Sequence, residues 1–205
     1  MKQLILGNLK YIISLIITIF IFLCIKYFFG EYIVSIDNYI YHIIHNDNIY
    51  EFLNLMNILT NFGEEYTFII ILIVMLLINK KDTIYEFINL IFTFLVNVLT
   101  KNLFMRQRPV NSLIELPSGF SFPSGHTMCS VSFYGFLIFL IIKKIQNKYL
   151  KIFSILFLIM LILIVAFSRI YLKVHYFTDV VGGLILGIIC LLMIINIYKK
   201  ELNKI

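Results

Sequence analysis

Long apolar segments separated by short polar ones set the hydrophobic pattern of this 205-residue chain. A helix needs about 20 apolar residues to cross a hydrocarbon core about 30 Å thick, and most of the segments come close to that length. The pattern therefore predicts an all-α polytopic membrane protein, a bundle of six transmembrane helices. The predicted spans cover residues 11–29, 66–79, 84–104, 125–142, 151–167 and 178–198.

The first two predicted spans need separate arguments. Lys2 and Lys10 precede the first span, as they would in a signal peptide, but the segment is long and no small-residue cleavage pattern follows it. These features favour a retained helix. The second span is short, and Glu64 and Glu65 stand at its start. We expect it to recruit residues near Asn61 or to lie where the bilayer is thinned.

The segment between these two spans, from Tyr32 to Leu59, mixes apolar residues at helical spacing with polar ones. This pattern predicts amphipathic helices that lie along the membrane interface. His42 and His45 are one helical turn apart in this segment, which would suit a metal ion. Two interfacial histidines without further ligands are more often solvated, and we favour that interpretation.

Composition supports a membrane protein with one domain. Hydrophobic residues make up 61% of the chain and charged residues 14%, values that set it apart from soluble proteins. No internal repeat or linker interrupts residues 1–205, so we expect a single membrane-embedded domain. Cys24, Cys129 and Cys190 lie far apart inside apolar segments, which indicates neither a disulfide framework nor a metal site.

The net charge of +6 does not indicate nucleic-acid binding, because the positive residues form no continuous tract. They fall instead in alternate connections between the predicted spans, which the positive-inside rule places in the cytoplasm. Both termini would then be cytoplasmic, and the acidic connection 30–65, which has no Lys or Arg, would face outward. The lysines concerned are Lys2, Lys10, Lys80, Lys81, Lys143, Lys144, Lys148, Lys151, Lys199, Lys200 and Lys204.

A few cations stand in connections that should face outward, contrary to the positive-inside rule. A positive residue that opposes the topological bias points to chemistry rather than to orientation. These cations are Lys101, Arg108 and Arg169, with Arg106 and Lys173 as further members. The first three belong to short motifs at the ends of predicted spans, which share the outward side.

The first motif joins Lys101 to Arg108 and Pro109 at the end of the third predicted span, where proline stops the helix. A guanidinium offers a planar fork for two phosphate oxygens, and an ammonium adds a compact charge. The pair could therefore hold one phosphoryl group from two directions. Taken alone, the two residues are equally well explained by snorkelling toward lipid headgroups.

The second motif, Pro123-Ser124-Gly125-His126, opens the fourth predicted span. Proline suits the first turn, serine is a good cap, and glycine lets an anion approach the backbone. Free N–H groups and the positive end of the helix dipole attract phosphate, and His126 could donate a proton to a departing oxygen. The alternative is a structural cap with an incidental histidine.

The third motif contains Ser168-Arg169, then His175 after five residues and Asp179 after three more. This arrangement is typical of nucleophilic catalysis, in which the imidazole attacks and a carboxylate fixes its tautomer. Asp179 could reach the far nitrogen of His175 if that turn is helical, while Arg169 holds the transferring oxygens. A buried pair that satisfies itself is the alternative, which the neighbouring cations disfavour.

The ordered set K-x6-RP, PSGH and SR-x5-H-x3-D resembles the signature of the type 2 phosphatidic acid phosphatase superfamily. Members of that family cleave phosphomonoesters or pyrophosphates of lipids through a phosphohistidine intermediate and without a metal ion. The resemblance implies His175 as nucleophile, Asp179 as its orienting partner and His126 as general acid. It implies phosphate binding by Lys101, Arg108, Ser124, Gly125 and Arg169, and no cofactor.

Several functions remain open at this point. The same superfamily includes soluble vanadate-binding haloperoxidases, but membrane burial favours a substrate with an apolar tail. A transporter or lipid-binding protein without catalysis could also use the basic cluster, although the complete set of His126, His175 and Asp179 speaks against it. Among lipids, an outward-facing site in the cell membrane slightly favours undecaprenyl pyrophosphate, with phosphatidic acid and phosphatidylglycerol phosphate as alternatives.

Overall fold

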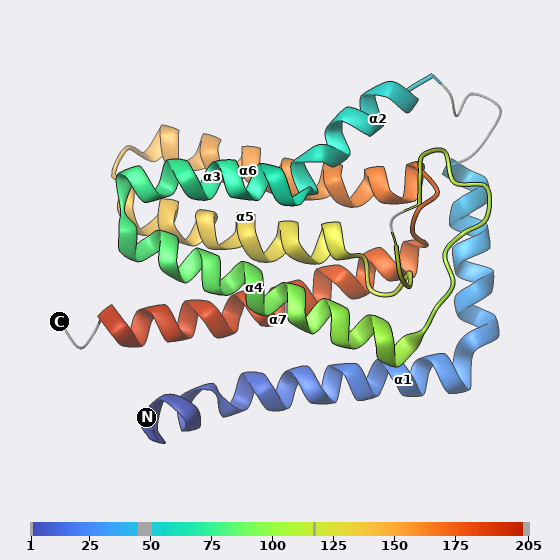
Figure 1. The fold of residues 1–205 in the computed structure, drawn as a ribbon, viewed down its shortest axis with the longest axis horizontal. Helices are drawn as coiled ribbons and strands as arrows, with labels where there is room; N and C mark the ends of the chain where they lie inside the picture. Colours follow the sequence, from blue (N-terminus) through green and yellow to red (C-terminus); the bar gives the residue numbers. More distant parts are fainter. Residues whose placement is uncertain (1, 45–50, 117, 203–205) are drawn as a thin grey trace.

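The computed structural model describes residues 2–44, 51–116 and 118–202. All the regular structure in these residues is helical, which confirms the predicted fold class (Figure 1). The elements are α1 (Lys2–Ile44), α2 (Leu53–Thr60), the 3-10 helix η1 (Asn61–Gly63), α3 (Glu65–Ile78), α4 (Lys80–Phe104), α5 (Gly125–Lys144), α6 (Lys148–Tyr171) and α7 (Phe177–Leu202).

Helices α4, α5, α6 and α7 and the Leu9–Phe28 part of α1 are each long and apolar enough to cross a membrane. The second predicted span is different, because α3 has only 14 residues. Together with the Leu53–Gly63 segment, from which it bends by 49°, α3 meets the requirement. The described residues thus contain five candidate spans, or six if this bent pair is one span, which agrees with the expected recruitment of residues near Asn61.

Local signals in the sequence explain where the long helices begin and end. Asn79 and Asn147 precede α4 and α6, and their side chains accept hydrogen bonds from backbone N–H groups of the first turn. Helix α4 ends where Met105 adopts a left-handed conformation, with φ of 46°, and donates its N–H to Lys101 O. This ending starts the loop that carries Arg108.

Helix α5 lies between α4, α6 and α7 in the bundle (Figure 1). Its most extensive contact is with α7, where two glycines leave no room for side chains. A Cβ atom added to Gly183 would lie 2.8 Å from Ser124 O, and one added to Gly187 would lie 2.7 Å from Met128 O. Small residues at such an interface let membrane helices meet through their backbones.

Helix α1 lies outside this core for most of its length, and none of its candidate span is buried. Figure 1 shows that α1 bends and that its C-terminal part runs across the end of the bundle. This part belongs to the predicted amphipathic segment, and its Asp37 is buried, with 3% exposure. His45 lies outside the described residues, so the expected solvation of the His42 and His45 pair stays a prediction.

A row of buried polar side chains on α4 faces α5 and has no counterpart in the sequence-based expectations. Asn89 donates to Ser132 O at 3.0 Å and accepts from the Ser132 hydroxyl at 2.7 Å, while Thr93 donates to the same hydroxyl at 2.9 Å. Hydrogen bonds of this kind hold helices together where no water competes.

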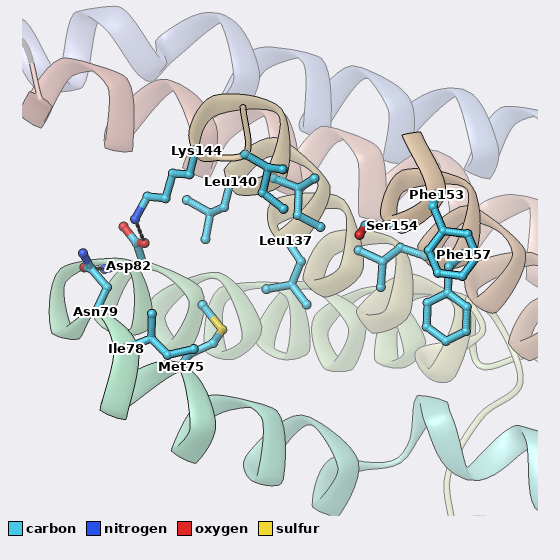
Figure 2. A pocket seen from close by; sticks show the side chains of 13 residues that line it. Met75, Ile78, Asn79, Asp82, Leu137, Leu140, Lys144, Phe153, Ser154 and Phe157 are labelled. Atoms are coloured by element: carbon cyan, nitrogen blue, oxygen red, sulfur yellow. Dashed lines mark hydrogen bonds and ion pairs between the residues drawn. The ribbon is translucent and has the colours of Figure 1, made fainter. Parts of the chain in front are cut away.

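At the lysine-rich end of the bundle, Lys144 pairs with Asp82 beside an apolar groove (Figure 2).

Candidate functional site

The three sequence motifs meet at one end of the bundle, opposite the lysine-rich end. Lys101 and Arg169 lie in the last turns of α4 and α6, and His126 lies in the first turn of α5. His175 belongs to the connection between α6 and α7, and Asp179 to the first turn of α7. The apolar helices thus deliver all three motifs to one polar cluster.

His175 is buried with 3% exposure in a connection that folds back onto the end of α6. Its backbone N–H and that of Val174 both donate to Arg169 O at 3.2 Å. The ring nitrogen Nδ1 lies 3.5 Å from Asp179 Oδ2, so the predicted pairing is present although His175 precedes the helix. Ser121 adds a partner that the sequence did not indicate, with its hydroxyl 3.4 Å from the same Nδ1.

The second ring nitrogen of His175, Nε2, lies 3.1 Å from Arg108 Nη1. A guanidinium can only donate, so Nε2 accepts and the proton of the neutral ring belongs on Nδ1, beside Asp179. Burial lowers the pKa of His175 to about 3, with Asp179 opposing the shift and the charges of Arg169 and Arg108 adding to it. The imidazole is therefore neutral near pH 7 and carries a lone pair on Nε2.

Arg169 is almost completely buried, with 1% exposure, and only part of its guanidinium is satisfied. Its Nη1 donates to the Thr60 hydroxyl at 2.6 Å. Its Nε and Nη2 atoms have no hydrogen-bond partner among the residues that the structure describes. A buried donor without an acceptor costs about 1–3 kcal/mol, and more when the group is charged. Two such donors on one cation indicate a place for an anion.

Two further cations face the same space. Lys101 is partly buried and interacts electrostatically with both Arg108 and Arg169. Arg108 donates to Val174 O at 2.9 Å and to Gly119 O at 3.1 Å, in addition to its contact with His175. Like charges gathered in this way repel one another, so their proximity also indicates an anionic ligand.

The start of α5 differs in detail from the expectation. Ser124 occupies the cap position, but its side chain makes no capping bond; its hydroxyl accepts from the Thr127 hydroxyl at 3.0 Å. Gly125 has a packing role that the sequence did not indicate, because an added Cβ would lie 3.2 Å from Asn97 Oδ1. Glycine here allows close packing against α4. Ser124 thus stands at the predicted cap position without the expected capping bond, and the predicted first-turn proline is wrong, since Pro123 precedes the cap position.

His126 has a partner that the sequence did not predict. Its Nε2 lies 2.8 Å from Glu64 Oε1, at the break between η1 and α3. Thr60, the partner of Arg169, comes from the same bent pair. The acidic start of the second span was visible in the sequence, but it was interpreted only in terms of span length and topology.

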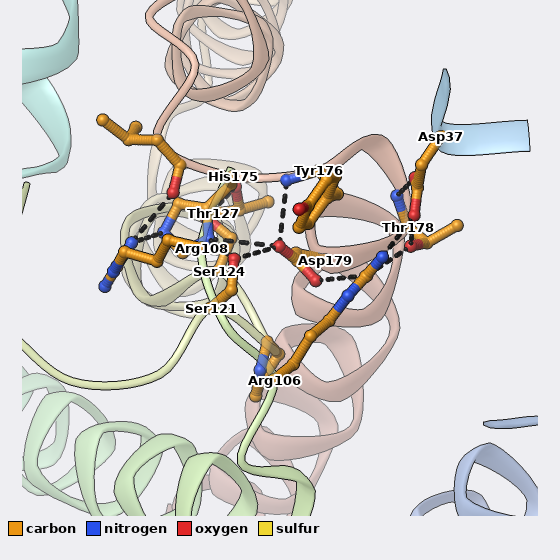
Figure 3. Close-up of polar contacts among 12 residues, drawn as sticks. Asp37, Arg106, Arg108, Ser121, Ser124, Thr127, His175, Tyr176, Thr178 and Asp179 are labelled. Carbon is orange, nitrogen blue, oxygen red and sulfur yellow. Dashed lines mark hydrogen bonds and ion pairs between the residues drawn. The ribbon is translucent and has the colours of Figure 1, made fainter. Parts of the chain in front are cut away.

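Arg106, Ser121 and Asp37 complete the surroundings of Asp179 (Figure 3). Asp179 Oδ1 accepts from Arg106 Nη1 at 2.7 Å, and Oδ2 accepts from the Ser121 hydroxyl at 2.5 Å. Arg106 also pairs with Asp37 at 2.5 Å. The sequence had indicated Arg106, because it is a cation in a connection expected to face outward. Asp37 had been attributed to topology, and no local pattern indicated Ser121.

Comparison with known proteins places the sequence of this chain in a family. Residues 83–202 match the sequence profile described as the PAP2 superfamily. Phosphatidylglycerophosphatase B of Bacillus subtilis (strain 168) is 34% identical over 108 residues, which are 52% of this chain and 53% of that protein. The match therefore spans about half of the curated relative's length.

Two solved structures share the fold. The first, a transmembrane PAP2 type phosphatidylglycerolphosphate phosphatase from Bacillus subtilis, has a TM-score of 0.76 and 22% identity, covering 95% of this chain and 96% of that one. Aquifex aeolicus LpxE has a TM-score of 0.64 and 20% identity, covering 76% and 92%. Since the matched profile covers more than half of the chain and contains every residue of the three motifs, this protein belongs to the PAP2 superfamily.

Proposed function

We propose that the protein is an integral-membrane lipid phosphatase that hydrolyses a lipid phosphomonoester or pyrophosphate through a phosphohistidine on His175. The observation that carries this proposal is Arg169, a buried guanidinium whose Nε and Nη2 lack acceptors among the described residues. These donors share one site with two more cations and with an imidazole nitrogen that carries a lone pair. The arrangement suits a tetrahedral anion that is attacked on phosphorus.

In the first step, Nε2 of His175 attacks phosphorus and the bond from phosphorus to the leaving oxygen breaks. Arg108, whose Nη1 donates to Nε2, moves onto the phosphoryl oxygens as they arrive. His126 gives a proton to the departing oxygen, which is an alkoxide or a phosphate. The imidazole becomes cationic as the N–P bond forms, and Asp179 beside Nδ1 stabilises that charge.

In the second step, water attacks the phosphohistidine, His126 accepts its proton, and inorganic phosphate leaves with Nε2 restored. Phosphoryl transfer depends mostly on positioning and on stabilising charge on the equatorial oxygens. Lys101, Arg108 and Arg169 supply that charge, with Ser124 and the Gly125 amide at the helix start. We therefore expect no metal or other cofactor to be needed.

The substrate class is a membrane lipid with a phosphate headgroup, because the site lies at the end of an apolar bundle. Of the three lipids left open by the sequence, the curated relative favours phosphatidylglycerol phosphate, and we place it ahead of undecaprenyl pyrophosphate and phosphatidic acid. The alternating distribution of lysines supports cytoplasmic termini and an active site at the outer face of the cell membrane. Labelling of a tag at the C-terminus in intact cells would contradict this orientation.

The test is a time course of inorganic phosphate release by the purified protein from these three lipids, ranked by kcat/KM. His175→Ala should abolish release without unfolding the protein, while His42→Ala, which changes an exposed histidine on α1, should keep it. Binding without any release would favour the non-catalytic lipid-binding alternative. A chelator should leave the wild type active, and loss that magnesium restores would contradict a metal-free reaction.

A further inference from the structure

Arg106 joins two buried carboxylates that come from distant parts of the chain. Its Nη1 donates to Asp179 Oδ1 at 2.7 Å and its Nη2 to Asp37 Oδ2 at 2.5 Å, and Nη1 also donates to the Thr178 hydroxyl at 2.7 Å (Figure 3). The side chains of Asp37 and Asp179 are 1% and 0% exposed, while that of Arg106 is 21% exposed. The guanidinium therefore lies at the edge of the site and reaches inward.

The contacts of Asp179 divide between its two oxygens. Arg106 is the charged partner of Oδ1. Oδ2 accepts from Tyr176 N at 2.9 Å and from the Ser121 hydroxyl at 2.5 Å, and lies 3.5 Å from Nδ1 of His175. A carboxylate held on one oxygen alone can rotate about its last bond. With Oδ1 fixed by Arg106, Oδ2 stays on the imidazole.

Arg106 is itself held on several sides. Asp37 accepts from Thr178 N at 2.9 Å and from the Thr178 hydroxyl at 2.8 Å, so its carboxylate is fixed where it pairs with Arg106. The guanidinium also lies 4.2 Å from the centre of the Tyr176 ring. Burial opposes its charge, but Asp179 and Asp37 outweigh that effect and raise the pKa of Arg106. A planar fork suits two carboxylates at once, which an ammonium does not.

We propose that Arg106 is a positioning residue, which holds the Asp179 carboxylate on His175 and is oriented in turn by Asp37 of α1. The proposal rests on the proposed function of His175 as nucleophile. Its consequence is that α1 takes part in catalysis, although Asp37 lies outside residues 83–202, which match the family profile. Arg106 touches no reacting atom, because its effect reaches the substrate through Asp179 and then His175.

A purely structural role is the competing explanation, in which Arg106 only ties α1 to the bundle. The two explanations differ in what changes. A tether predicts lower thermal stability with unchanged turnover of the folded fraction. A positioning role predicts lower kcat with KM unchanged, because phosphate binding by Arg108 and Arg169 remains. The partial exposure of Arg106 also allows guanidinium from solution to reach the space that an alanine leaves.

The experiment measures phosphate release by purified Arg106→Ala, Arg106→Lys and Asp37→Asn, with Glu31→Gln as a matched change of an exposed acid on α1. We expect Arg106→Ala to lower kcat by about 10- to 100-fold, the size of the loss when a partner that orients a metal-bound histidine is removed. Arg106→Lys and Asp37→Asn should lose less, and Glu31→Gln nothing. Guanidinium ion should raise kcat of Arg106→Ala saturably and leave the wild type unchanged.

A second measurement does not depend on activity. Nitrogen NMR of labelled histidine should show His175 as the Nδ1-protonated tautomer in the wild type and as a mixture in Arg106→Ala. An unchanged tautomer together with unchanged kcat would overturn the positioning role, as would a loss of stability that accounts for all lost activity. If the wild type releases no phosphate but the tautomer changes as described, the proposed function fails and the positioning role stands.

Discussion

Replacing Arg169 with methionine should separate stability from activity, because Arg169 is buried with two donors that lack acceptors among the described residues. In the empty protein each such donor costs about 1–3 kcal/mol. Methionine has a similar length and no donors, so the empty variant should unfold at a temperature equal to or above that of the wild type. The expected gain resembles the replacement of other buried charges by apolar residues.

Activity should change in the opposite direction. If each of the two donors binds a phosphoryl oxygen, each bond contributes about 1.5–3 kcal/mol, because the acceptor is charged. Their loss amounts to about 3–6 kcal/mol, or about 10²- to 10⁴-fold in kcat/KM. Arg169→Lys, which keeps the charge but not the fork, should lie between the wild type and the methionine variant.

The assay combines phosphate release with thermal unfolding in detergent, with and without inorganic phosphate. Phosphate should raise the unfolding temperature of the wild type and not that of Arg169→Met. The double variant Arg169→Met with Thr60→Val serves as a control, because Arg169→Met alone leaves the Thr60 hydroxyl without its hydrogen bond from Nη1. An empty Arg169→Met that unfolds well below the wild type, or that keeps kcat/KM within tenfold, would refute the assignment of these donors to phosphate.

Three further outcomes can be measured. Protonation of His175 would block its attack on phosphorus, but burial holds its pKa at about 3. Hydrolysis of an aryl phosphate should therefore keep its rate from about pH 8 to about pH 5. A pH profile with its midpoint near the ordinary histidine pKa of about 6.5 would contradict this. Glu64→Gln removes the negative charge beside His126, so kcat should fall about tenfold for lipid but not for aryl phosphate, whose leaving group needs no proton. Gly187→Ala should destabilise the protein by about 1–3 kcal/mol in thermal unfolding, because its Cβ would meet Met128 O.

The parts of the structure that could be predicted from the sequence depend on local patterns. Apolar length determines the spans, and the confirmed family follows from motif spacing that stays within short segments. Lys101, His126 and Arg169 lie at the ends or beginnings of apolar helices, so the predicted bundle already placed them on the same side of the membrane. The short second span also followed from its length, since fourteen residues in α3 cannot cross without help from the preceding segment.

The parts that could not be predicted are contacts between distant segments. Arg106 and Asp37 are 69 residues apart, and His126 and Glu64 are 62 apart, so no local pattern joins them. The capping bond expected of Ser124 is absent for a related reason. Propensity favours a serine bond to the backbone, but Thr127 one turn later offers a hydroxyl instead, and tertiary packing decides between them.

The main-chain contact between α5 and α7 has a consequence for how this protein can vary. Gly183 and Gly187 bring the two backbones together, and Ser124 N donates to Asp179 O at 3.0 Å. The helices that carry His126 and Asp179 are thus spaced by atoms that every residue possesses. Side chains on the outer surface of the bundle can change while the distance between His126 and Asp179 stays the same. The relative placement of these two side chains is therefore independent of changes on the outer surface of the bundle.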